Sequence, residues 1–191
     1  KNFKTKFDGF LTMSNLGYQK LFDTNINEKV LINNLSYKSF DKITDYGIIN
    51  SYEIFVKNFN AESKNSKYLK NKRENDLQGI VQFNSSLPLK KQGFKFSSSL
   101  TPIFVAKYNP YKNKNIKNSS NFVDYNNIYS INRIGSNETL EGNSSITIGN
   151  EFKIFNNTDN TNEIFGINLA TSIRDKKNDD LSEKSSLGEK A

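Results

Sequence analysis

Hydrophobic and polar residues alternate with a period of two along most of this chain, whereas helical periodicity is weak throughout. Successive side chains of a β-strand point to opposite faces, so this period predicts strands with one apolar and one polar face. The clearest example begins at Ser145, after which Ile146, Ile148, Phe152 and Ile154 share one face. In total the pattern predicts strands at residues 10–22, 29–37, 46–59, 77–87, 94–108, 145–155 and 163–173.

Polar segments separate the predicted strands. Residues 60–73 are expected to form a polar loop, residues 88–93 a turn, and residues 156–162 a hairpin turn. Consecutive strands joined by such segments predict an antiparallel meander. Pro102 has no N–H to donate to a neighbouring strand, so an irregularity is expected at that position.

Strand length distinguishes two all-β architectures, a soluble sandwich and the wall of a transmembrane barrel. Most of the predicted strands reach the roughly 9–11 residues that a tilted strand needs to cross a bilayer, whereas strands in soluble sheets are most often about 5–6 residues long. The polar faces carry Gly, Ser, Thr, Asn and Gln, as a water-filled lumen would. We therefore expect residues 1–191 to form a partial β-barrel domain, an antiparallel meander of long strands within a large transmembrane β-barrel.

The ends of the sequence and the strand count favour an internal piece of a longer protein. The chain begins at Lys1 rather than at an initiator Met. The seven predicted strands are an odd number, whereas single-chain bacterial barrels normally close with an even number of strands. Residues 109–142 are far longer than a hairpin loop, and loops of this length usually have a function. They are expected to form an inserted loop, and the charged residues 174–191 a loop or a truncated end.

Composition narrows the possible functions. The net charge is +7, but lysine greatly outnumbers arginine and the basic residues are scattered, so we do not expect nucleic acid as a partner. The absence of His and Cys excludes zinc sites and Ser-His or Cys-His catalysis within this chain. No stretch approaches the roughly 18 consecutive apolar residues of a membrane helix. A membrane would therefore be contacted by β-structure.

Two sequence motifs are candidates for catalytic sites. Ser39 and Lys42 fit S-x-x-K, but the S-D-N and K-T-G sequences that accompany it in β-lactamases are missing. Glu138 and Glu141 could act as an acid–base pair, although loop charges paired with Arg133 explain them better. We expect no catalytic residue, no cofactor and no metal, and hence no enzyme.

The segment 126–142, NNIYSINRIGSNETLEG, carries a family resemblance. It is similar to a segment of the LPS-assembly protein LptD family that reads roughly N-[IL]-[FY]-S-[IL]-N-R, a short loop and E-G before a long strand. Further similarities lie at residues 100–108 and 178–188, with Ser182 where a proline is usual in the family. The residues that match the central motif include Asn127, Ser130, Asn132, Arg133, Glu141 and Gly142.

The resemblance implies a transport function at the cell outer membrane. Proteins of this family form a barrel of about two dozen strands that inserts lipopolysaccharide into the outer leaflet. The implied partners are lipopolysaccharide, outer-membrane lipids, an LptE-like plug lipoprotein, and a periplasmic lipopolysaccharide bridge reached through an N-terminal domain missing here. Under this hypothesis the motif loop lies over or in the lumen, and Arg133 forms a structural ion pair there.

Two alternatives stay open at this point. The first is another outer-membrane β-barrel, a porin or a receptor, which the central motif disfavours. The second is a secreted carbohydrate-binding β-protein, which would be soluble without detergent.

Overall fold

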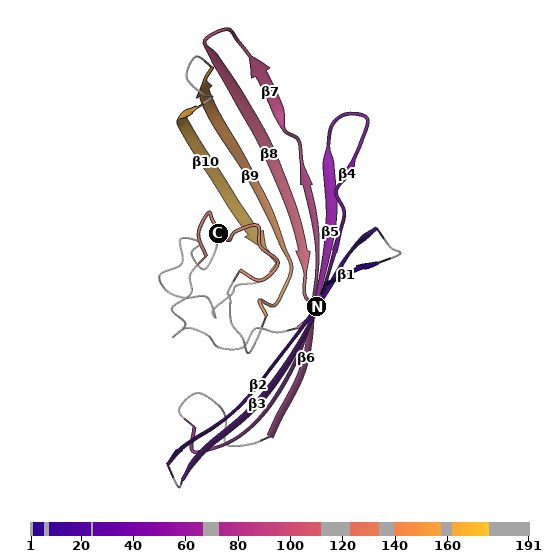
Figure 1. Cartoon of the computed structure of the whole chain (residues 1–191), viewed down its shortest axis with the longest axis vertical. Helices are drawn as coiled ribbons and strands as arrows, with labels where there is room; N and C mark the ends of the chain where they lie inside the picture. Colours follow the sequence, from indigo (N-terminus) through magenta and orange to yellow (C-terminus); the bar gives the residue numbers. More distant parts are fainter. Residues whose placement is uncertain are drawn as a thin grey trace.

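The structure is a computed structural model that describes residues 2–5, 8–23, 25–66, 73–111, 123–133, 140–157 and 162–175. These residues form one antiparallel sheet of ten strands, and they include no α-helix. Figure 1 shows the long strands side by side in a curved sheet. The strands are β1 (Asn2–Thr5), β2 (Gly9–Asp23), β3 (Ile26–Ser39), β4 (Lys42–Ile43), β5 (Ile49–Lys64), β6 (Arg73–Ser86), β7 (Leu89–Gln92), β8 (Phe96–Tyr108), β9 (Ser145–Asn156) and β10 (Asn162–Arg174).

The strand order confirms the predicted all-β antiparallel meander. The main path runs β1-β2-β3-β5-β6-β8-β9-β10, so each long strand pairs with the next long strand in the sequence. All seven predicted strands are present as β2, β3, β5, β6, β8, β9 and β10. The described sheet is open, with β1 and β10 at its two edges, and this arrangement is consistent with a section of a barrel wall.

The structure corrects several predicted boundaries. Residues 60–64 and residue 73 belong to β5 and β6 rather than to a polar loop, β6 begins before residue 77, and the predicted turn contains β7. The polar ends of β5 continue the two-residue period, because Ala61 and Ser63 are buried while Glu62 and Lys64 are exposed. All four residues of β7 are exposed, so a search for apolar alternation finds no strand there. The short strands β1 and β4 were not predicted either.

The irregularity expected at Pro102 is present. β8 changes its partner at this point, pairing with β6 through Ile103 on one side and with β7 through Leu100 on the other. The gap is bridged by the N–H of Leu87, which donates to the carbonyl of Pro102 at 3.1 Å. β6 and β7 thus follow one line along β8, interrupted where proline cannot donate to the ladder.

The two faces of the sheet differ in chemistry. Residues directly opposite in the register share a face, and Phe104–Ile148 and Phe152–Ile167 are two such pairs. We call the face that holds them the apolar face. It exposes Met13, Leu31, Leu35, Tyr52, Ile54, Leu77, Val81, Phe104, Tyr108, Ile146, Ile148, Phe165, Ile167, Leu169 and Ile173.

The opposite face, which we call the loop face, is polar where β6, β8, β9 and β10 lie side by side. Because side chains alternate between the two faces of a strand, the polar residues between the apolar ones point to this face, and several of them are buried. The described parts of the long connection between β8 and β9 lie against this region, near the lower ends of β9 and β10 in Figure 1. Its buried polar residues include Gln78, Gln82, Lys107, Ser145, Thr147 and Ser172.

The loop face is apolar at the ends of β2, β3, β5 and β6, in the lower part of Figure 1. Here the loop face holds a buried apolar cluster of Val30, Ile32, Phe59 and Ala61, with Tyr18 packed against it. The apolar face is interrupted there by polar side chains, among them Asn33, which donates to Asn58 at 3.3 Å. The exterior of this region is mixed, because Leu31 and Leu77 are exposed among these polar side chains.

Candidate functional site

The loop face is covered by the segments 123–133 and 140–144 of the long connection. Several hydrogen bonds attach them to the sheet, and three of these involve side chains of β6 and β8. Gln82 Nε2 donates to the carbonyl of Tyr129 at 2.9 Å, Lys107 Nζ to the carbonyl of Ser130 at 2.9 Å, and the Leu140 N–H to Gln78 Oε1 at 2.8 Å. Apolar loop side chains are buried as well, namely Val123, Ile128 and Leu140.

The first part of the loop is a compact turn stabilised by its asparagines and aspartate. The N–H of Ile128 donates to the carbonyl of Asp124 at 2.9 Å, and the side chain of Asn127 accepts from the Asp124 N–H at 3.0 Å. Such side-chain to backbone bonds are the reason why Asn and Asp favour turns. This turn directs Tyr125 and Tyr129 onto β9.

Tyr125 and Tyr129 connect the turn to β9. Their rings meet edge to face with centroids 5.7 Å apart, and the Tyr125 hydroxyl donates to Glu151 Oε1 at 2.9 Å. Burial, and then the hydrogen bond to Glu151, raise the pKa of Tyr125, so it stays protonated and able to donate. Tyr129 lies directly over Gly149, where an added Cβ would overlap its hydroxyl. Glycine at this position makes room for the aromatic ring.

Arg133 and Glu141 form a buried ion pair at the other end of the loop. Arg133 Nε donates to Glu141 Oε2 at 2.6 Å, and Nη2 donates to the other carboxylate oxygen, so the pair is bidentate. The same guanidinium also donates to Ser172 Oγ at 2.7 Å and to Ser145 Oγ at 3.1 Å. Both side chains are almost fully buried, and together they join the loop to β9 and β10.

Two further cations approach the same carboxylate. Lys107 Nζ lies 3.5 Å from Glu141 Oε2, and Arg174 Nε lies 3.5 Å from Oε1. We call Lys107, Arg133, Glu141 and Arg174 the ion cluster. Burial alone would raise the pKa of Glu141, but Lys107, Arg133 and Arg174 together lower it to about 2. The carboxylate is therefore charged at every physiological pH.

The structure brings Arg133, Glu141, Asn127 and Ser130 into one loop that packs on the sheet, and the other two motif residues belong to the same loop. Gly142 is buried and precedes Asn143, whose φ of 69° lies in the left-handed region that asparagine tolerates. Asn132 is partly buried, and its Oδ1 has no hydrogen-bond partner in the part of the chain that the structure describes. None of the six projects a reactive group into a cavity that the structure records.

The remaining candidates from the sequence either form no site in the structure or lie outside the described residues. Ser39 Oγ accepts a hydrogen bond from the Tyr52 N–H at 2.9 Å, while Lys42 is exposed, so the S-x-x-K match is not assembled into a site. Glu138 and the family similarity at 178–188 lie outside the described residues. Of the predicted terminal segment 174–191, Arg174 is the last residue of β10, and residues 176–191 lie outside the described residues. Among the described residues, no group of acidic side chains is arranged to hold a metal ion.

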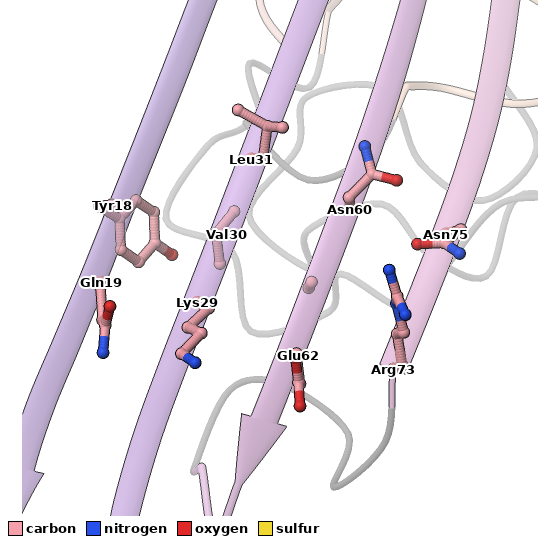
Figure 2. A pocket seen from close by; sticks show the side chains of 10 residues that line it. Tyr18, Gln19, Lys29, Val30, Leu31, Asn60, Glu62, Arg73 and Asn75 are labelled. Atoms are coloured by element: carbon pink, nitrogen blue, oxygen red, sulfur yellow. The ribbon is translucent and has the colours of Figure 1, made fainter.

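A pocket lined by both apolar and polar residues lies at the ends of β2, β3, β5 and β6. Figure 2 shows its lining residues on these four adjacent strands. Its volume is about 280 Å³. The register places Gln19, Lys29, Glu62 and Arg73 in one row across the strands. The row is solvent-exposed and combines both signs of charge, so it defines no single ligand chemistry.

The charge of Glu141 predicts an acid-sensitive loop. Because the folded-state pKa is lowered from 4.5 to about 2, the unfolded state binds more protons between these values. The contribution of Glu141 to stability is therefore fully present above about pH 5 and is lost as the pH falls toward 2. Unfolding followed by tyrosine fluorescence across pH 2–7 would measure this slope, and Glu141→Gln is expected to reduce it. An unchanged slope in that variant would contradict the assignment.

No helix among the described residues is long and apolar enough to cross a membrane. No protein-family model matches this chain, and neither does any curated protein.

Proposed function

We propose that this chain is a wall segment of an outer-membrane β-barrel that inserts lipopolysaccharide into the outer leaflet. The observation that carries the proposal is the placement of the motif loop. The residues that carry the family resemblance, Arg133 and Glu141, attach this loop to the polar face of a sheet whose other face exposes large apolar side chains. A lipid-facing exterior and a partly filled polar interior are what a transport barrel needs.

The proposed activity requires no bond-making residue. Transfer of a lipid needs an apolar outer wall, a polar lumen and a route into the membrane, and the ion cluster serves to hold the loop in place. The proposed location is the cell outer membrane, and the proposed partners are lipopolysaccharide, outer-membrane lipids, an LptE-like plug lipoprotein and a periplasmic lipopolysaccharide bridge. Connection lengths support an orientation, because barrels of this kind have longer loops outside the cell. The motif loop would then lie toward the extracellular end.

Depletion of the full-length protein in its host cell tests the proposal. In depleted cells, newly made lipopolysaccharide at the cell surface is labelled from outside and quantified. In undepleted cells, fractionation shows where the protein is recovered. We expect the protein in the outer membrane and lipopolysaccharide to accumulate inside the cell. Normal surface lipopolysaccharide with an outer-membrane protein would instead indicate a porin or receptor. Recovery in the medium without detergent would indicate a secreted carbohydrate-binding protein.

A further inference from the structure

The ion cluster has more positive than negative charge. Lys107, Arg133 and Arg174 are cations, and Glu141 is the single carboxylate that the described residues place among them. All four side chains are almost completely buried, with exposed fractions of 1–4%. Burying charge without a counterion is costly, so a buried cluster whose described basic groups outnumber its carboxylate favours the binding of a further anion.

Arg174 is the member of the cluster without a hydrogen-bond partner. Its side chain is 4% exposed, and its Nε, Nη1 and Nη2 atoms donate to no atom of the described residues. The nearest carboxylate oxygen, Glu141 Oε1, lies 3.5 Å away, beyond the usual 2.7–3.2 Å of an N–H···O bond. That oxygen already accepts from Arg133 Nη2. Beyond this ion pair with Glu141, the guanidinium of Arg174 keeps most of its donor capacity in a buried position.

Lys107 provides a second donor beside Arg174. Its ammonium group donates to the carbonyl of Ser130 at 2.9 Å and lies 3.5 Å from Glu141. An ammonium carries three N–H groups, so one donor remains after these two contacts. A guanidinium fork next to an ammonium is a favourable arrangement for the oxygens of a phosphate group.

We propose that Arg174, assisted by Lys107, binds a phosphate group at the end of the loop where Glu141 meets β8 and β10. The phosphate supplies the negative charge that the buried cluster lacks. It can be free inorganic phosphate or a phosphate carried on the sugar of a lipopolysaccharide. The second source, in which the site would contact the transported lipid, rests on the proposed function.

The first experiment measures phosphate binding to the purified full-length protein in detergent. Titration with inorganic phosphate is followed by ³¹P NMR line broadening at constant ionic strength set with chloride. We expect Arg174→Met to weaken binding by about ten-fold to a hundred-fold, as loss of hydrogen bonds to a charged group does. Arg73→Met removes an exposed arginine and is expected to leave binding unchanged. Equal binding by the protein and its Arg174→Met variant, or no binding by either, would overturn the proposal.

The second measurement distinguishes a binding residue from a structural one. In phosphate-free buffer Arg174→Met is expected to be at least as stable as the unaltered protein, because it removes a buried charge with unmet donors. Phosphate should raise the unfolding midpoint of the unaltered protein and not that of the variant. A variant that is strongly destabilised without phosphate would show that Arg174 is already satisfied within the fold, and would overturn the proposal.

The source of the phosphate is tested with lipid A in mixed micelles. If phosphorylated lipid A displaces bound inorganic phosphate and a dephosphorylated form does not, the site binds a phosphate carried on the lipid. If neither form of lipid A displaces bound inorganic phosphate, the site binds the free ion. Failure of both arms leaves the proposed transport function standing, because surface delivery of lipopolysaccharide is measured separately in cells.

Discussion

Replacing Glu141 with glutamine is expected to lower the free energy of unfolding by about 3–5 kcal/mol, the range typical of removing one partner of a buried ion pair. The amide keeps the shape of the side chain but removes the one negative charge that faces Lys107, Arg133 and Arg174. The two buried guanidinium groups and the Lys107 amine would then lie together without a counterion. The expected result is release of the loop from the sheet before or during global unfolding.

A matched control is available in the same sheet. Lys153 and Glu163 form an ion pair at 3.3 Å, with side chains 36% and 44% exposed. Exposed pairs contribute about 0–1 kcal/mol, so Glu163→Gln is expected to have little effect. Urea unfolding of the full-length protein in detergent, monitored by tyrosine fluorescence, compares the two variants. Equal and small losses for both would mean that the ion cluster does not anchor the loop.

The fold was predictable because the signal that defines it is local. Alternation with a period of two needs only neighbouring residues, and Ile146, Ile148 and Phe152 define a strand without knowledge of what lies beside it. Polar strands escaped prediction for the same reason. β7 has no apolar alternation, and only its pairing with β8 identifies it as a strand.

The site was predictable only in part, because its members come from distant segments. The motif drew attention to Arg133 and Glu141, which lie eight residues apart in the chain. Lys107 and Arg174 belong to β8 and β10, and their approach to Glu141 depends on the register of both strands with β9. Gly149 likewise reads as an ordinary strand residue until the ring of Tyr129 is found above it. The sequence offered one signal for Lys107 and Arg174, namely that each is a charged residue at the end of a strand on the face away from the apolar residues.

The second large effect is expected at Leu169, in the middle of the apolar row of β10. This row consists of Phe165, Ile167, Leu169 and Ile173, and Leu169 is 63% exposed. If the apolar face contacts lipid, Leu169→Arg places a charge near the bilayer centre. The expected cost is about 2–4 kcal/mol for arginine near the midplane of a barrel wall. Folding of the full-length protein into phospholipid vesicles, measured by the heat-modifiable shift on gels, reports this loss.

The adjacent residue provides the control that separates a membrane wall from a soluble sheet. Asn168 is also exposed but lies on the loop face, opposite Glu151 in β9. Substitutions facing a polar lumen are tolerated, so Asn168→Arg is expected to fold and insert normally. In a soluble protein both positions would be ordinary surface sites, where substitutions usually change stability by less than about 0.5 kcal/mol. A large loss confined to Leu169→Arg therefore indicates lipid on the apolar face, whereas two small effects would contradict a membrane wall and with it the proposed transport function.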